Sequence, residues 1–390
     1  MVSLIKSTFY NEAKTKYLLS EFILNSSILS MNIECSKFEK AFAIKQNRKY
    51  SVMVNSGSSA NLVLIQSLLN NGRLKKGDLV GVSALTWSTN IMPLIQLGLK
   101  VILVDCEIDT LNVSKNKLRE TYLEHPNMAM MFITNTLGHA DNIDEISEFC
   151  IKNNILFLED NCEGLGSKVN EKMLGNFGLA STFSFFVGHH LSTIEGGMVC
   201  TDDEELYKIL IMTRAHGWDR NLNNDEQLAL RQKHNVEDFY NKYTFYDLAF
   251  NVRPNEINGF IGNEQIKYID EIVEKREQNF YKIYDIIKEN RDLLNMRIDH
   301  MDVISSFAIP FVLKTKEKQK KYRKFFEDVN VEIRPMIAGN MLNQPFFKKY
   351  VNSDRDLINC NFIHENGFYC GNNPDMTEED ILTISNVIKK

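Results

Sequence analysis

The fold prediction rests on one stretch of sequence, Ser184-Phe185-Phe186-Val187-Gly188-His189-His190-Leu191-Ser192-Thr193-Ile194-Glu195-Gly196-Gly197. It joins a Ser-Phe pair, two adjacent histidines and a closing Glu-Gly-Gly. Upstream of it, short apolar segments alternate with segments that have the amphipathic spacing of helices. This alternation predicts an α/β protein with a mainly parallel sheet that is covered by helices on both faces. In such sheets ligands bind at the carboxyl ends of strands.

The alternation predicts a series of elements in the first 250 residues. The expected strands are Tyr50–Val54, Asp78–Ser83, Lys100–Asp105, Met128–Thr134, Ile155–Glu159 and Gly197–Thr201. The expected helices are Glu12–Leu24, Met31–Ala43, a helix that follows Asn61 and runs through Leu69, Ser88–Leu97, Ser114–Tyr122, Ile143–Asn153 and Glu204–His216. Boundaries derived in this way are approximate.

The remainder of the chain predicts a second, smaller part. Residues Asn221–Tyr246 are polar and predict low regularity, and Glu256–Asn290 predicts one long amphipathic helix with a solvated charged face. Ser305–Leu313 and Val331–Arg334 predict strands, and Glu378–Ile388 predicts a final helix. We therefore expect a large domain over residues 1–250, including an N-terminal helical segment, and a small C-terminal α/β domain over residues 251–390.

Composition narrows the classes of function. The chain has 390 residues and a net charge of -6, which argues against binding to nucleic acid. No run of 18 apolar residues and no signal-peptide core is present, so we expect no membrane span. Seven scattered cysteines without a Cys-x-x-Cys pair predict free thiols in the cytoplasm and argue against an iron–sulfur centre; no metal site is expected.

Three motifs fall at predicted strand ends. They are the small-residue turn Asn55–Asn61, the segment Leu85–Ser88 and the segment Glu159–Glu163. The turn leads into a helix N-terminus, which can bind an anion through free N–H groups and the helix dipole. Each motif alone also fits a structural role: a capped helix, a Trp in the core at Trp87, or a capping Asp at Asp160. Their shared position at one sheet edge favours a ligand site.

These motifs resemble those of the sugar aminotransferase family named after DegT, DnrJ and EryC1, over nearly the whole chain from about Met31. In that family Ser-Phe is followed after three residues by a Lys that holds pyridoxal phosphate, and the segment closes with Glu-Gly-Gly. Here His189 stands at the Lys position, and no Lys lies between Lys172 and Lys208. The chain is therefore most similar to the dehydratase branch, above all to members that act on GDP-4-keto-6-deoxymannose in colitose biosynthesis.

The resemblance implies a fold-type I aminotransferase fold and a set of cofactor contacts. It implies that Gly57, Ser58 and Ser184 bind the phosphate, that Trp87 stacks on the cofactor ring, that Asp160 pairs with the pyridinium nitrogen, and that Glu163 lies beside the ring. It also implies that Asn251 reaches the phosphate site of a partner subunit. The active unit is then at least a homodimer with shared active sites.

The resemblance further implies the reaction. His189 cannot tether the cofactor but can move protons near neutral pH. Pyridoxal phosphate would be converted by L-glutamate to pyridoxamine phosphate, which would act on a nucleotide-linked, GDP-preferring 4-keto-6-deoxy sugar. The C3 hydroxyl would leave, giving a 4-keto-3,6-dideoxy sugar for O-antigen or capsule synthesis. Arg220, Arg253 and Arg334 are candidates for binding the anionic substrate, with surface ion pairing as the alternative.

Other readings stay open at this stage. The protein could be a nucleotide-sugar 4-aminotransferase, or a catalytically silent protein that senses a nucleotide sugar or the cofactor. The ascarylose-pathway dehydratase also has His in place of Lys but uses an iron–sulfur cluster, for which this chain lacks the cysteines. The sugar could be a hexose or a heptose, because the first thirty residues and Asn221–Tyr246 match the family poorly.

Overall fold

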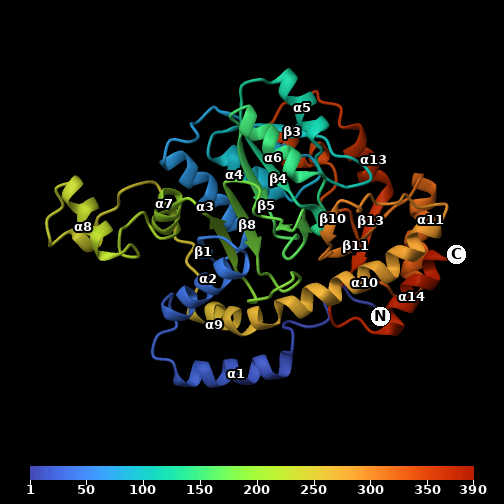
Figure 1. The fold of residues 1–390 in the computed structure, drawn as a ribbon, viewed down its shortest axis with the longest axis horizontal. Coiled ribbons are helices and arrows are strands. Elements are labelled where there is room, and N and C mark those ends of the chain that lie inside the picture. The colour runs from blue at the N-terminus through green and yellow to red at the C-terminus, as the bar shows by residue number, and fades with distance from the viewer.

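A seven-stranded sheet forms the centre of the structure, a computed structural model that describes residues 1–390 (Figure 1). Its strands are β1 (Tyr50–Val54), β2 (Leu79–Ser83), β3 (Lys100–Val104), β4 (Met128–Thr134), β5 (Leu156–Asp160), β8 (Ala180–Ser184) and β9 (Gly197–Thr201). They lie in the order β1-β9-β8-β5-β4-β2-β3. Only β9 is antiparallel to its neighbours β1 and β8, so the predicted mainly parallel sheet is confirmed.

Side chains that alternate along the strands pack into two separate hydrophobic clusters. In β1, Val52 and Val54 join the larger cluster, whereas Met53 joins the smaller one. Because successive strand side chains point to opposite faces, both faces of the sheet are buried. The smaller cluster is covered by α2 (Ile33–Lys45), which contributes Phe38 and Phe42.

Helices of the α/β alternation cover the rest of the sheet. They are α3 (Gly57–Asn70), α4 (Ser88–Gln96), α5 (Lys115–Glu124), α6 (Ile143–Lys152) and α7 (Glu204–Arg214), and α5 and α6 pack against each other as a separate pair. Helix α3 is the most deeply placed, since it packs against β8 and β9 and against α4 and α7. Its N-cap is Ser56, whose hydroxyl accepts a hydrogen bond from the Ser59 N–H. The helix thus begins directly at the carboxyl end of β1.

The predicted long helix is interrupted. It consists of α9 (Glu256–Gln265), a single tighter turn over Ile266–Tyr268, and α10 (Ile269–Glu289), which follow one another above α1 in the lower half of Figure 1. The tighter turn keeps right-handed helical backbone angles, so the hydrophobic spacing gives no sign of the change. On the outside, α1 (Glu12–Asn25) packs against α9.

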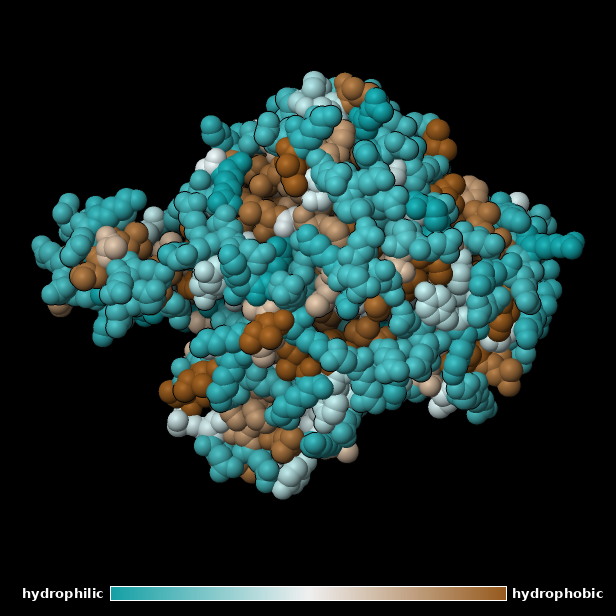
Figure 2. Space-filling model, viewed as in Figure 1, coloured by the Kyte–Doolittle hydropathy of each residue, from teal (hydrophilic) through white to brown (hydrophobic).

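The segment Asn221–Tyr246 is more regular than predicted. It contains α8 (Asn224–Lys233), which begins with a capping box formed by Asn223 and Glu226. None of the residues of α8 is buried, so the helix has no apolar stripe for the sequence to reveal. We call residues 218–248 the arm, because they project from the body beside α7 (Figure 1). Figure 2 shows apolar side chains on its surface, and Phe239, Tyr243 and Leu248 are exposed.

The C-terminal part is built around a three-stranded antiparallel sheet in the order β11-β13-β12. Its strands are β11 (Ala308–Val312), β12 (Ile333–Pro335) and β13 (Gly367–Gly371). In addition to α10, it contains the helices α11 (Lys316–Asp328), α12 (Pro345–Tyr350), α13 (Ile358–Asn366) and α14 (Glu378–Ile388). The predicted strands near residues 305 and 331 and the final helix are present, whereas β13 and α11 to α13 were not predicted. A further small sheet pairs β10 (Met301–Val303) with β6 (Lys168–Val169), which pairs with β7 (Lys172–Met173).

The two parts of the chain share one hydrophobic core. The larger cluster of 74 buried residues draws from both sides of residue 250. The first ten residues lie along the C-terminal part: Val2 bridges to Val331, and the Leu4 N–H donates to a Glu332 carboxylate oxygen at 2.9 Å. A division near residue 250 stays a prediction. None of the helices combines the length and the apolar character needed to cross a lipid bilayer.

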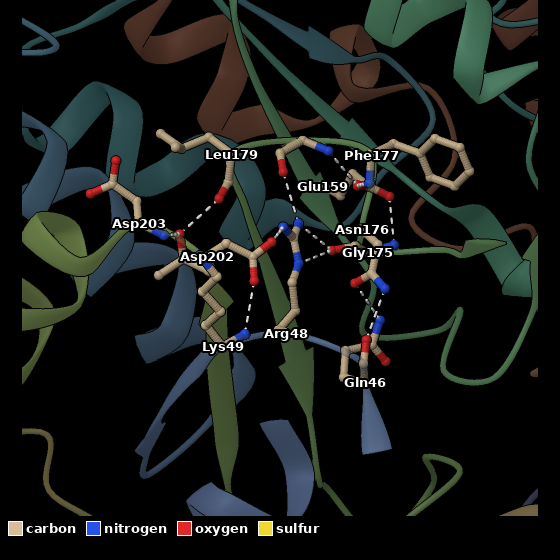
Figure 3. A network of polar contacts seen from close by, with 12 residues as sticks. Gln46, Arg48, Lys49, Glu159, Gly175, Asn176, Phe177, Leu179, Asp202 and Asp203 are labelled. Atoms are coloured by element: carbon tan, nitrogen blue, oxygen red, sulfur yellow. Dashed lines mark hydrogen bonds and ion pairs between the residues drawn. The ribbon is translucent and has the colours of Figure 1, made fainter. Parts of the chain in front are cut away.

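A buried carboxylate fixes the end of β5. Glu159 is fully buried and accepts hydrogen bonds from the backbone N–H groups of Gly175, Phe177 and Gly178 at 2.6 to 2.8 Å (Figure 3). Arg48 holds the same turn from the other side, by donating to the carbonyls of Gly175 and Gly178. Because strand side chains alternate, anchoring Glu159 on one face sets the next residue, Asp160, on the opposite face.

Candidate active site

A cavity of about 790 Å³ opens at the carboxyl ends of the central strands. Its walls come from the large sheet, from β12 and β13 of the C-terminal part, and from Ser3 to Ile5 of the N-terminus. Most of the predicted site residues line it together: Gly57, Ser58, Trp87, Asp160, Glu163, Ser184, His189 and Arg334. Three predicted residues, Asn251, Arg220 and Arg253, do not line it.

One end of the cavity is a cradle suited to an anion. The N-terminus of α3, with Gly57 and Ser58, meets Ser184 at the end of β8. A side chain at Gly57 would place its Cβ 2.7 Å from the Cβ of Ser184, so only glycine fits this approach. Gly197 is equally constrained, since its Cβ would lie 2.3 Å from the Ser56 carbonyl oxygen. Free N–H groups, a helix dipole and hydroxyls in one place favour a phosphate.

Asp160 lies at the bottom of the cavity and is only 5% exposed. Its Oδ2 accepts hydrogen bonds from Asn61 at 3.1 Å and Asn90 at 2.6 Å, and its Oδ1 accepts the N–H of Cys162 at 2.9 Å. Thr182 in turn donates to the Asn61 side chain, which orients the amide. Hydrogen bonds to a carboxylate favour its charged form, so this network holds an anion in a fixed position.

Trp87 stands at the other wall as the residue before α4. Its side chain is 55% exposed, which is unusual for a large aromatic residue and excludes the core-packing role. Nearby, the hydroxyls of Thr86 and Thr134 are hydrogen-bonded to each other at 2.6 Å. An exposed aromatic face beside a fixed carboxylate can stack on a flat, cationic ring.

His189 is carried by the loop between β8 and β9. The loop is closed at its base by the pair Ser184–Gly197 and by hydrogen bonds from Phe185 to Gly196 and from Thr193 to Phe185. The His189 N–H donates to the Phe186 carbonyl at 2.8 Å, which makes a local turn. Ile194 has a φ of 72°, in the left-handed region, as the chain turns back toward β9.

The two adjacent histidines have different surroundings. His189 lines the large cavity, whereas His190 is 4% exposed and its Nε2 lies 2.7 Å from the Ser305 carbonyl oxygen. Burial and the nearby charge of Arg276 lower the pKa of His189 to about 4. His189 is therefore neutral at pH 7 and able to accept a proton, while His190 is a structural residue.

Glu163 shows the opposite effect on a carboxyl group. Burial raises its pKa to about 8, although the Leu137 N–H donates to it at 2.8 Å and opposes the shift. The neighbouring charge of Asp160 also raises it. Glu163 is therefore mostly protonated at pH 7 in this chain and can donate a hydrogen bond into the cavity.

The three predicted residues outside the cavity form a surface group with Trp218. The guanidinium of Arg220 lies 3.8 Å from the Trp218 ring centre, and that of Arg253 lies 5.4 Å from it. Arg253 also donates to the side chain of Asn251 at 2.9 Å. All three predicted residues are exposed, so nothing within this chain brings them to the cavity.

Several residues of the site were not predicted. Asn61 and Asn90 hold Asp160, and Phe307, Glu332 and Tyr369 bring the C-terminal part into the cavity wall. The sequence could have indicated the two asparagines, because each lies in the first turns of a helix that begins at one of the predicted site motifs. No pattern in the sequence marked Phe307 or Tyr369, whose strands pack there only through tertiary structure.

The residues present fit pyridoxal phosphate in a non-covalent form. The cradle that only glycine allows would hold the phosphate, Asp160 would meet the ring nitrogen and Trp87 the ring face. The Nδ1 atom of His189 is buried without a hydrogen-bond partner, which leaves Nε2 as the ring nitrogen available to the cavity. Among the lining residues there is no lysine that could tether the cofactor.

Comparisons with known proteins agree with this arrangement. The chain is 35% identical to GDP-4-keto-6-deoxy-D-mannose 3-dehydratase from Escherichia coli O55:H7 over 381 residues, covering 96% of each chain. A solved structure of GDP-4-keto-6-deoxymannose-3-dehydratase, a His-to-Asn variant with bound GDP-perosamine, superposes with a TM-score of 0.90 at 33% identity and covers 100% of both chains. Another, with a trapped PLP-glutamate geminal diamine, gives a TM-score of 0.89 at 33% identity and also covers 100% of both.

These matches establish the fold class and the family. The predicted fold, that of aminotransferases dependent on pyridoxal phosphate, is confirmed by the superpositions over the whole chain. A family model described as the DegT/DnrJ/EryC1/StrS aminotransferase family matches residues 12–389. The chain belongs to the DegT/DnrJ/EryC1/StrS aminotransferase family.

Proposed function

We propose that this protein is a 3-dehydratase that removes the C3 hydroxyl from a GDP-linked 4-keto-6-deoxy sugar, with pyridoxal phosphate as cofactor and L-glutamate as amine donor. The observation that carries the proposal is the neutral imidazole of His189 at the position where aminotransferases of the family have Lys. The relatives named for this reaction match 96% and 94% of the chain. A relative holds PLP-glutamate and another holds GDP-perosamine, which supports the same ligands here.

The cofactor supplies an amine that can condense with the C4 ketone and a ring that stores an electron pair. Asp160, fixed by Asn61 and Asn90, keeps a negative charge for the ring nitrogen. Trp87 presents an exposed face for stacking, and the cradle at Gly57 holds the phosphate. These residues bind and orient the cofactor without forming a bond to it.

His189 moves the proton. Its imidazole belongs to a residue that lines the cavity, is neutral at pH 7 and can take up a proton from carbon. The resulting imidazolium is a strong acid, because burial and Arg276 disfavour its charge. It can therefore return the proton to the C3 hydroxyl, which leaves as water. A lysine at this position could instead deliver a proton to complete transfer of the amino group.

The proposal also covers the residues that would act only in contact with a second subunit. Asn251, Arg220 and Arg253 are exposed and outside the cavity of their own chain, and the arm carries exposed aromatic residues. We infer a homodimer in which these residues complete the site of the other subunit, where the arginines contact the phosphates of the substrate. All seven cysteines are unpaired, which supports the reducing cytoplasm as the location.

The test is analysis of the products. The purified protein with pyridoxal phosphate, L-glutamate and GDP-4-keto-6-deoxymannose should release ammonia and 2-oxoglutarate and yield a sugar nucleotide that has lost the C3 oxygen. A product that retains nitrogen at C4 would identify a 4-aminotransferase instead. Binding of the sugar nucleotide without turnover, for both the hexose and the corresponding heptose, would identify a sensor.

A further inference from the structure

A buried arginine lies behind the loop that carries His189. Arg276 of α10 is 3% exposed, and its Nη1 donates to the backbone carbonyls of Phe307, at 3.0 Å, and Asn372. Its Nε has no partner. The other buried arginine, Arg214, is paired with the carboxylate of Glu39, whereas Arg276 pairs with no carboxylate. An unpaired buried charge costs free energy, so its presence points to a role other than stability.

Arg276 shares a second, small cavity with the two histidines. This cavity of about 30 Å³ is lined by residues 7–10 of the N-terminus, the loop around His189 and His190, and Arg276. His189 lines both this cavity and the large one. Gly188 lines both cavities as well, so the loop at Gly188 and His189 separates the substrate side from the side that holds the guanidinium.

Arg276 is also linked to His189 through Phe307. The ring of Phe307 lines the large cavity and packs against His189, with ring centres 5.2 Å apart and planes at 51°. The carbonyl of the same Phe307 accepts the Arg276 hydrogen bond. Asn372 fixes the preceding carbonyl, that of Ser306, at 2.8 Å. The segment before β11 is thus anchored by Arg276 at the point where its side chain contacts the imidazole.

The charges around His189 come from several elements. The titratable and charged groups on the large-cavity side are Asp160, Glu163, Glu195, Glu332 and Arg334, and those on the small-cavity side are Arg276 and His190; of these, Glu163 and His190 are mostly uncharged at pH 7. Asp375, which follows β13, is the carboxylate whose charge acts on Arg276. Among these charged groups, Arg276 is the one that acts on the pKa of His189, and it lowers it in addition to burial.

We propose that Arg276 is a positioning residue for the elimination: it holds Phe307 against the imidazole of His189 and keeps that imidazole uncharged until it takes up the proton from carbon. The proton then leaves with the C3 hydroxyl as water, so the imidazole ends the elimination step neutral and this step needs no further reactant. This role rests on the proposed function, but its central property, the charge state of His189, can be measured without turnover.

The experiment follows the titration of His189 in the holoenzyme. Protein labelled with ¹³C at histidine Cε1 is loaded with pyridoxamine phosphate, and the His189 resonance is assigned with His189→Asn, since the chain has 8 histidines. The wild type should stay neutral well below pH 6.5. In Arg276→Gln the midpoint should rise by about one pH unit, because a positive neighbour has been removed. Arg276→Lys keeps the charge and should titrate like the wild type.

A second readout separates charge from packing. In single turnovers with the sugar substrate, the acidic limb of the pH–rate profile should move upward in Arg276→Gln by the same amount as the NMR midpoint. A purely structural role would lower the rate equally at every pH and leave the midpoint unchanged, which would overturn the proposal. If Arg276→Gln does not fold, a wild-type midpoint at or above 6.5 overturns it, and a lower midpoint that Arg276→Lys preserves supports it. A shifted midpoint in an enzyme that makes an amino sugar would refute the proposed function alone.

Discussion

The bottom of the cavity and the arm differ in how completely one chain builds them. At the bottom, Asp160 and His189 are held by hydrogen bonds and packing from neighbouring strands and helices of the same chain. The arm, residues 218–248, instead presents α8 without a buried residue and several exposed aromatic side chains. Arg220 of the arm and the nearby Arg253, both predicted to bind the anionic substrate, contact Trp218 rather than the cavity. One chain therefore builds the region of the proposed chemistry, whereas the substrate contacts proposed for Arg220 and Arg253 need a second subunit.

The largest effect is expected from the centre of the cavity. His189→Asn removes the group that moves the proton, so the rate of dehydration should fall by about 10³-fold. Binding of cofactor and sugar nucleotide should remain, because the cradle, Trp87 and Asp160 are untouched. Rapid-quench turnover and calorimetric binding measure the two effects. His190→Asn is the matched control for a neighbouring imidazole that has no access to the large cavity; a greater loss of rate there than in His189→Asn would contradict the assignment.

The second prediction tests whether Asn251, which follows the arm in the chain, serves another subunit. His189→Asn and Asn251→Ala, each inactive alone, should regain activity when co-expressed with different tags and purified as a heterodimer. One of its two sites then combines an intact cavity with an intact Asn251, so the purified heterodimer should recover about half of wild-type activity.

The control for that experiment pairs two variants of the cavity bottom. His189→Asn with Asp160→Asn places one defect in each site, so no activity should return. Activity in this control heterodimer would contradict the prediction. Absence of activity in the heterodimer of His189→Asn and Asn251→Ala would also contradict it, because Asn251 would then not complete the cavity of the other subunit.

The sequence could indicate Asp160 and His189 as residues of one cavity because their determinants are local. Asp160 ends an apolar strand and His189 stands in a short motif, and the resemblance to the family gave both their predicted roles. The helix α8 was missed because exposed helices lack the apolar stripe on which prediction depends, although its capping box was visible. Arg276 was overlooked within a helix whose charged face was expected to be solvated. Yet it lies four residues from both Ile272 and Phe280, on the buried stripe of α10.

The third prediction concerns the phosphate cradle. In Gly57→Ala the new methyl group would lie 2.7 Å from the Ser184 Cβ, so β8 and the start of α3 must separate. We expect affinity for pyridoxal phosphate to fall by about tenfold, equivalent to about 1.4 kcal/mol. Cofactor absorbance during equilibrium dialysis measures the loss. Ser67→Ala changes a buried residue in the same helix, away from the cradle, and should bind the cofactor normally. Equal affinity in Gly57→Ala and the wild type would show that the close approach is not needed.

The smallest effect joins the two regions through Glu163. Its pKa is raised to about 8 by burial, so between the unfolded value and pH 8 the folded protein binds a proton that the unfolded protein does not. Stability of the cofactor-free protein should therefore decrease as pH rises from about 5 to 8. Glu163→Gln has no such proton and should lose that part of the decrease, so its melting temperature should rise relative to that of the wild type as pH rises.

If a partner subunit brought Arg220 or Arg253 close to Glu163, the positive charge would lower the pKa of Glu163, and the melting temperatures of the two proteins would change with pH in the same way. Parallel melting would therefore mean that the subunits meet nearer the cavity bottom than the surface positions of these arginines suggest, and the contrast between a complete and an incomplete region would have to be redrawn.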